Sequence, residues 1–182
     1  MKYFFVIALF ICSSCRQSCS KDEAKKVMGD WFLRKIELPE NMRLINSENV
    51  DEKLEFNIYT KKSHKYILHY FLADCDKCVN ELQEIQSYFN AHKEQYKDTK
   101  LLLIATGPID LYVKDAAKKL NFQYPIYFDK DYQSFKISNK LPLGDKLYNT
   151  MLLDGDDKLL IFGAFYSNSK AEKLYEGLIS CD

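Results

Sequence analysis

The sequence contains two cysteines, Cys75 and Cys78, three positions apart in the stretch YFLADCDKCVNEL, residues 70–82. Two thiols at this spacing can form a reversible disulfide, supply two ligands to a metal ion, or lie close together without reacting. Spacing alone does not decide between these roles, because Cys12 and Cys15 near the amino terminus repeat it. The decision depends on the elements that position each pair.

The pair at 75 and 78 stands where a buried strand gives way to a helix. Tyr66 to Phe71 (YILHYF) is apolar on both faces, which predicts a central strand. From Cys75, apolar residues recur at helical spacing as far as Tyr96, which predicts a helix of about five turns. Free backbone N–H groups and the dipole at the start of a helix stabilise a thiolate and lower the pKa of its thiol. Cys75 is therefore the expected nucleophile, and Cys78 the cysteine that resolves a mixed disulfide.

With these features the chain resembles the thioredoxin superfamily and, within it, the anchored thioredoxin-like proteins of the TlpA/ResA type. The resemblance runs from about residue 53 to residue 180. YILHYFLADCDKC stands where the family has a strand followed by W-C-x-x-C, and LLLIATG, LNFQYPIYFDKD and NTMLLDGDDKLLIFG are similar to its later strands and hairpin. The resemblance implies an α/β thioredoxin-like fold, with a central mixed sheet flanked by helices and an N-terminal strand extension. It also implies thiol–disulfide exchange with protein thiols or disulfides as clients, and no cofactor beyond the dithiol.

Two residues around the pair depart from the family. Asp74 replaces the usual tryptophan, and its negative charge opposes thiolate formation at Cys75, whereas Lys77 favours it. His69 stands six residues before Cys75, where thioredoxins carry a buried acid that takes a proton from the resolving cysteine. A histidine can accept that proton. A lone histidine on a buried strand is more often a hydrogen-bonded core residue, so both roles stay open.

The expected substrate-binding loop also departs from the family. Thioredoxins carry a cis-proline just before the hairpin, where it faces the disulfide and presents a backbone edge to the substrate. Counting back from MLLD, this position falls at Tyr148 or Asn149. A cis bond at a non-proline residue costs about 2.5–4 kcal/mol, so we expect a trans loop here. The missing proline favours an alternative function, a non-catalytic thioredoxin-fold binding lipoprotein in which the cysteine pair is a static disulfide.

The remaining candidate ligands do not predict a metal site. Structural zinc takes four ligands, and the other cysteines expected in the mature protein, Cys19 and Cys181, stand near the two chain ends. Cys181 is either a free thiol or the partner of Cys19. The acidic run 154–157 (DGDD) lacks the alternating donors and the final glutamate of a calcium-binding loop, and it predicts a hairpin turn.

The amino terminus predicts export and lipid attachment. One lysine precedes the apolar run 3–12, which is too short for a bilayer span of about 20 residues and is typical of a secretory signal peptide. The segment resembles the signal of bacterial lipoproteins, with Cys15 as the lipidated residue and Cys19, followed by charged residues, as the alternative. A plain cleaved signal with incidental cysteines is the remaining interpretation. We expect a protein of the bacterial cell envelope, lipid-anchored to a membrane on the periplasmic side or at the cell surface.

The chain divides into a signal peptide (1–14), a tether (15–30), an N-terminal extension (31–52) and a thioredoxin-like domain (53–182). Alternation or apolar runs predict further strands at 54–58, 101–105, 124–128, 150–153 and 159–162. Helical spacing predicts a helix over 112–120, and a capping box at 169–172 predicts the start of the last helix. The 26 basic residues balance 26 acidic ones without a basic stripe, which argues against a nucleic-acid partner. We expect a monomer.

Overall fold

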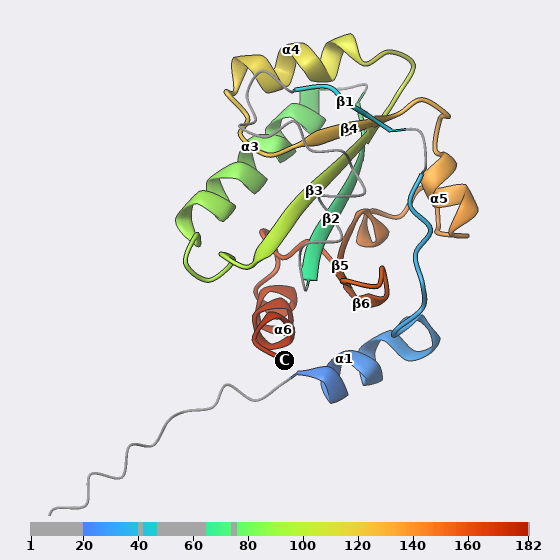
Figure 1. Ribbon diagram of the computed structural model, residues 1–182, viewed down its shortest axis with the longest axis vertical. Helices are drawn as coiled ribbons and strands as arrows, with labels where there is room; N and C mark the ends of the chain where they lie inside the picture. Colours follow the sequence, from blue (N-terminus) through green and yellow to red (C-terminus); the bar gives the residue numbers. More distant parts are fainter. Residues whose placement is uncertain (1–19, 40–41, 47–64, 74–75, 182) are drawn as a thin grey trace, which may run out of the picture.

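The structure is a computed structural model that describes residues 20–39, 42–46, 65–73 and 76–181, with the backbone alone for 76–79. Helices cover a central twisted sheet (Figure 1). None of the helices in these ranges combines the length and the apolar character that crossing a bilayer requires. The predicted strand at 54–58 lies outside the described residues.

The sheet is mixed and has six strands in the order β1-β4-β3-β2-β5-β6. The adjacent strands β4, β3 and β2 are parallel to one another, whereas β1, β5 and β6 run antiparallel to their neighbours. The strands are β1 (Arg43–Leu44), β2 (Lys65–Leu72), β3 (Thr99–Thr106), β4 (Ile126–Asp129), β5 (Thr150–Asp154) and β6 (Leu159–Phe162). The predicted fold class, with its mixed sheet and N-terminal strand, is confirmed.

Helices lie on both faces of the sheet because neighbouring residues of a strand point to opposite sides. On one face, β2 directs His69 towards α3, which packs beside α4 and is hydrogen-bonded to α6. On the other face, Tyr70 contacts Phe135 of α5. The helices are α1 (Lys21–Met28), α3 (Asp76–Ala91), α4 (Leu111–Lys119), α5 (Ser134–Ser138) and α6 (Ser169–Ile179), with 3-10 turns η1 (Gly29–Trp31) and η2 (Lys146–Asn149).

Two helix ends differ from their predictions. The helix expected to reach Tyr96 ends at Ala91, and a series of turns follows it, although Tyr96 is still buried. Apolar spacing therefore predicted the burial of Tyr96 correctly but not its conformation. At α6 the capping residue is Asn168, whose side chain accepts hydrogen bonds from the N–H groups of Lys170 and Ala171. Ser169, the predicted cap, is the first helical residue, because asparagine caps at least as well as serine.

The segment predicted to be a polar tether contains a packed helix. Residues 21–28 form α1, which lies against β6 and α6 at the edge of the sheet. Ala24 and Met28, one turn apart, are buried, while most of the other side chains of α1 are charged and exposed. The residues that follow α1 close the edge of β6, because the N–H of Leu33 donates to the C=O of Leu159 and the N–H of Leu159 donates to the C=O of Arg34.

The N-terminal extension crosses from one edge of the sheet to the other over the α5 face (Figure 1). Lys35 pairs with Lys158 beside β6, and β1 pairs with β4 at the opposite edge. Midway, the buried Asn139 after α5 accepts a hydrogen bond from the N–H of Glu37 and donates one to its C=O, each at 2.8 Å. The side chain of Asn139 thus makes the two backbone hydrogen bonds to the extension that a neighbouring strand would make.

Replacing Asn139 with alanine is expected to lower the free energy of unfolding by about 2 kcal/mol, because both backbone groups of Glu37 lose their partner. Chemical denaturation measures this change. Asn90→Ala is the matched control, because its exposed side chain accepts a single surface hydrogen bond from Tyr124, and we expect a change below about 0.5 kcal/mol. Equal effects of the two substitutions would contradict the assigned role of Asn139.

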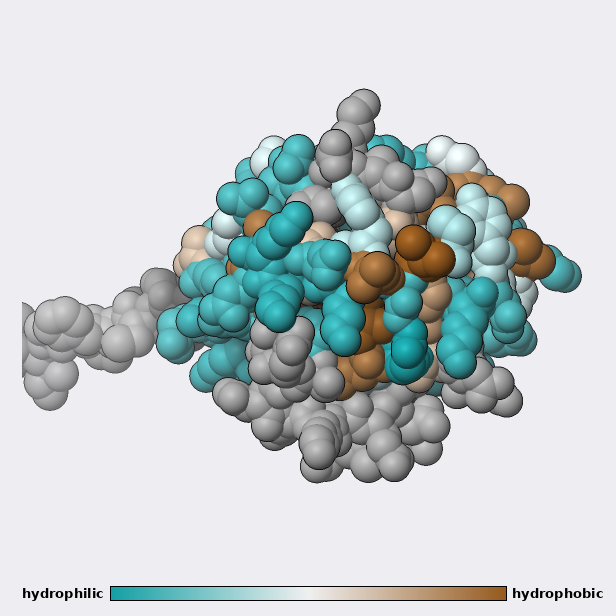
Figure 2. All heavy atoms as spheres, turned by 90° about the horizontal axis from the view of Figure 1, so that it is seen from above, coloured by the Kyte–Doolittle hydropathy of each residue, from teal (hydrophilic) through white to brown (hydrophobic). Residues whose placement is uncertain are grey.

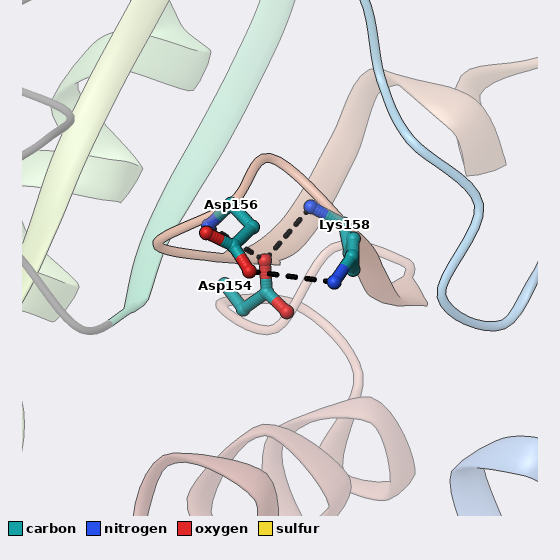
Figure 3. Close-up of polar contacts among 3 residues, drawn as sticks. All are labelled: Asp154, Asp156 and Lys158. Carbon is teal, nitrogen blue, oxygen red and sulfur yellow. Dashed lines mark hydrogen bonds and ion pairs between the residues drawn. The ribbon is translucent and has the colours of Figure 1, made fainter.

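The acidic run 154–157 closes the hairpin between β5 and β6 (Figure 3). The carboxylate of Asp154 accepts hydrogen bonds from the N–H groups of Asp156 and Lys158, each at 2.9 Å, and the ammonium of Lys158 reaches Asp156 at 3.3 Å. Asp157 adopts φ 65°, a left-handed conformation that aspartate tolerates. The predicted hairpin turn is confirmed.

Candidate functional site

The junction that carries the cysteine pair has the predicted form. β2 ends at Leu72, and α3 begins at Asp76, so a buried strand leads into a helix across three residues. Cys78 belongs to the first turn of α3. Cys75, which immediately precedes α3 in the sequence, lies outside the described residues, as does the side chain of Cys78.

His69 lies on β2, three residues before the strand ends, on the face of the sheet that α3 covers. Its side chain is completely buried. Its Nδ1 is 2.9 Å from the hydroxyl oxygen of Thr150 on the neighbouring strand β5. Its Nε2 has no hydrogen-bond partner among the described residues and lies 3.8 Å from Oε1 of Glu81 in α3. Among the described residues, only one of the two ring nitrogens of His69, the predicted proton acceptor, therefore has a hydrogen-bond partner. The other nitrogen faces the carboxylate of Glu81.

Glu81 links this buried histidine to the surface. The hydroxyl of Tyr166, in the loop after β6, donates a hydrogen bond of 2.6 Å to Oε1 of Glu81. Burial, followed by this hydrogen bond and the charge of Glu81, raises the pKa of Tyr166 well above its usual value of 10, so the phenol stays protonated and keeps donating. A fixed donor holds the carboxylate in place near His69.

Sequence reasoning did not identify Glu81 as a site residue and missed this contact. The available signal was its spacing, because Glu81 follows Cys78 by three residues in a helix, where such residues are neighbours. Nothing in the sequence indicated Tyr166, which comes from a loop 85 residues away.

Burial has the largest effect on the pKa of His69. Desolvation lowers the pKa of His69 to about 4, against a smaller opposing effect of the negative charge of Glu81. The imidazole is consequently neutral at pH 7 and a weak base there. Glu81, whose side chain is 24% exposed, connects it to a region that water reaches.

An open pocket of about 420 Å³ lies beside this group. Its walls come from α3, η2 and the loop after β6, and they include Glu81, Glu84, Lys146, Thr150 and Tyr166. Thr150 and Glu81, the two groups nearest the nitrogens of His69, therefore both border a solvent-accessible hollow.

The predicted substrate-binding loop borders the same region. Tyr148 and Asn149 end η2 immediately before Thr150, and every peptide bond in the described ranges, including those of this loop, is trans. The Tyr148 ring packs against Phe162 at 4.7 Å and Trp31 at 6.0 Å between ring centroids. Trp31, at the start of the N-terminal extension, thus packs against the loop, and both loop residues remain partly exposed.

A buried lysine holds the beginning of this loop. Lys136 of α5 is only 2% exposed, and its ammonium donates hydrogen bonds to the carbonyl oxygens of Pro142, Leu143 and Asp145 at 3.2–3.3 Å. Burial lowers the pKa of Lys136, and the charge of Asp145 opposes this shift. Three carbonyl groups converging on one cation fix a loop segment without regular structure. The sequence did not indicate this lysine.

Exposed hydrophobic residues surround the junction. β3 and β4 are parallel to β2, so the loops that follow them lie at the same end of the sheet as the cysteine pair. The loop that precedes the antiparallel β5 lies at this end too. These loops and the first residue of α4 carry large apolar side chains that are about half exposed: Ile109, Leu111, Tyr132, Leu143 and Leu147. Seen from above Figure 1, hydrophobic side chains gather near the middle of the face (Figure 2).

Within the described ranges, no three histidine, cysteine, aspartate or glutamate side chains come together in a way that could hold a metal ion. The polar groups at the junction are instead two hydroxyls, one carboxylate and one neutral imidazole. These groups can hold and exchange protons.

Comparison with known proteins supports the fold. No protein-family model matches the sequence. No curated protein matches it either. Among solved structures, the C-terminal domain of a protein assigned as a thiol-disulfide oxidoreductase in Bacteroides thetaiotaomicron superposes with a TM-score of 0.54 at 15% identity, covering 80% of this chain and 96% of that one. A thiol:disulfide interchange protein from Bacteroides sp. gives 0.50 at 14% identity over 71% and 81%. StoA from Bacillus subtilis gives 0.46 at 21% identity over 62% and 81%. The chain has a thioredoxin-like fold.

Proposed function

We propose that this protein is an extracytoplasmic thiol–disulfide oxidoreductase that exchanges disulfides through Cys75 and Cys78. The observation that carries the proposal is the position of the pair in a thioredoxin-like fold, between the end of β2 and the first turn of α3. A thiolate at a helix start is stabilised there by unpaired backbone N–H groups. The structural neighbours named above as oxidoreductases or interchange proteins are in keeping with this chemistry.

In the reductive direction, the thiolate of Cys75 attacks one sulfur of a client disulfide, forms a mixed disulfide and releases one client thiolate. The thiolate of Cys78 then attacks the sulfur of Cys75, breaks the mixed disulfide and releases the second client thiolate. The client gains two electrons and two protons, and the protein is left with a Cys75–Cys78 disulfide. The oxidative direction is the reverse.

His69 and Glu81 are the proposed proton acceptors for Cys78. Glu81 follows Cys78 by one helical turn, and its carboxylate lies 3.8 Å from the unpaired nitrogen of His69. A proton from the thiol of Cys78 passes to this pair and then to the adjoining pocket, which Glu81 and Thr150 border. Tyr166 is a positioning residue that holds the Glu81 carboxylate.

Clients are proteins that present a cysteine in an accessible, partly apolar segment. The half-exposed apolar side chains around the junction offer such a segment a contact surface. Tyr148 and Asn149 supply the backbone edge beside it. The lipid anchor at Cys15, with Cys19 as the alternative, would keep the protein in the bacterial cell envelope.

A trapping experiment tests the proposal. Cys78→Ser leaves Cys75 to form mixed disulfides that cannot be resolved, so the full-length variant in its native membrane should accumulate client adducts that disappear on reduction. The control is the Cys75→Ser, Cys78→Ser double variant, which should form none. Adducts of equal amount in both variants, or in neither, would overturn the proposal.

The alternative is a thioredoxin-fold binding protein in which the two cysteines form a static disulfide. The position at Tyr148 and Asn149, where the family carries proline, favours it. A redox titration separates the two functions, because structural disulfides have potentials below about −300 mV, whereas exchange proteins lie near −120 to −270 mV.

A further inference from the structure

A disulfide lies at the opposite end of the sheet from the junction. Cys181, just after α6, is disulfide-bonded and 5% exposed. The ammonium of Lys65, the first residue of β2, donates hydrogen bonds to the carbonyl oxygens of Ile179 and Cys181. Cys181 is therefore beside the amino end of β2, whereas Cys75 and Cys78 follow its carboxyl end.

Strand length excludes the C-x-x-C cysteines as partners of Cys181. The eight residues of β2 extend over about 23 Å at about 3.3 Å per residue. The Cα atoms of a disulfide are at most about 7 Å apart. The partner must therefore come from the amino-terminal cysteines, namely Cys12, Cys15 and Cys19.

The position of α1 selects among these three. Ser20 precedes α1 and accepts a hydrogen bond from the N–H of Ala24, and α1 packs against α6. Lys21 and Cys181 line the same pocket, and α6 ends beside the start of α1 (Figure 1). Cys19 is adjacent to Ser20 in the chain, one Cα step of about 3.8 Å away.

We propose that Cys19 and Cys181 form a structural disulfide that fastens the start of α1 to the end of α6. Two thiols give up two electrons and two protons when this bond forms, and a disulfide-bearing oxidase of the extracytoplasmic compartment accepts them. The bond occupies the sulfur of Cys19, so Cys19 cannot carry a thioether-linked lipid, and Cys15 is left as the lipid acceptor. Only residues 16–18 then separate the lipid from a residue bound to the folded domain, and the C-x-x-C end faces away from the anchor.

Peptide mapping of the full-length protein tests the bond, because trypsin cuts after Arg16 and separates Cys15 from Cys19. After thiols are blocked, a digest without reductant should contain residues 17–21 linked to residues 174–182, and this species should disappear on reduction. A link from Cys181 to a peptide that contains Cys15, Cys75 or Cys78, or a blocked thiol at Cys181, would overturn the assignment.

Two further readouts keep the assignment independent of the proposed catalysis. Cys19→Ser and Cys181→Ser should each lower the melting temperature by about 5–10 °C, and the double variant by no more than either. Cys12→Ser, the control, should leave it unchanged. Metabolic labelling with a fatty acid should be lost in Cys15→Ser and retained in Cys19→Ser, and the reverse result would contradict the bond. Loss of client trapping through Cys78 would leave all these results in place.

Discussion

Serine in place of Cys75 is expected to lower the rate of insulin-disulfide reduction by at least about 10³-fold. The attacking species is a thiolate, and a serine hydroxyl neither ionises near neutral pH nor forms a sulfur–sulfur bond. In the proposed mechanism no neighbouring residue takes over, because Cys78 resolves the intermediate and does not attack the client. The rate is measured from the precipitation of insulin chains with dithiothreitol as reductant.

Cys181→Ser is the matched control for this prediction. It removes one sulfur atom in the same way, but at the opposite end of β2 from the junction. We expect its activity at 25 °C to equal that of the wild type. If Cys75→Ser and Cys78→Ser both reduce insulin at the wild-type rate, the oxidoreductase proposal is wrong and the binding-protein alternative gains support.

The sequence predicted the elements whose burial is local and periodic. β2 and β3 are apolar runs that helices cover on both faces, and α4 buries Val113, Ala116 and Ala117 at helical spacing. These patterns need no knowledge of the partner surface, because any core satisfies them. The fold class followed from their order along the chain together with the resemblance.

The sequence did not predict elements that depend on distant partners. α1 has only Ala24 and Met28 as buried residues, and three apolar residues among charged ones are equally compatible with a tether. What makes it a packed helix is the edge of β6. Lys136 is similar, because its burial depends on three carbonyl groups from a loop that follows it.

The candidate site shows the same division. The spacing of the two cysteines and the strand before them predicted the junction, and the resemblance predicted His69, which stands where thioredoxins carry a buried acid. Glu81 and Tyr166 were missed because their meeting depends on how the loop after β6 packs against α3. Glu81 offered only its helical spacing from Cys78 as a signal, and Tyr166 offered none.

The burial of His69 predicts a pH-dependent loss of stability of about 3 kcal/mol between pH 6.5 and pH 4. In the unfolded chain the imidazole takes up a proton near pH 6.5, whereas in the folded protein burial holds its pKa at about 4. Between these values the unfolded state binds more protons than the folded state, so the free energy of unfolding falls as the pH falls. Above pH 6.5 both states are neutral at this residue, and the full contribution is present.

Urea denaturation of the wild type and of His69→Gln at pH 7, 5.5 and 4 measures this loss. Glutamine does not titrate, so the wild type should lose about 3 kcal/mol more than the variant over this range, while the carboxylates contribute alike to both. The titration of the His69 ring protons by NMR gives a second readout, with an expected midpoint near pH 4. A midpoint near 6.5, or parallel stability curves, would show that the folded protein accommodates the imidazolium. His69 would then be open to solvent or paired with Glu81 as an ion pair, and the neutral, weakly basic histidine inferred from its complete burial would be wrong.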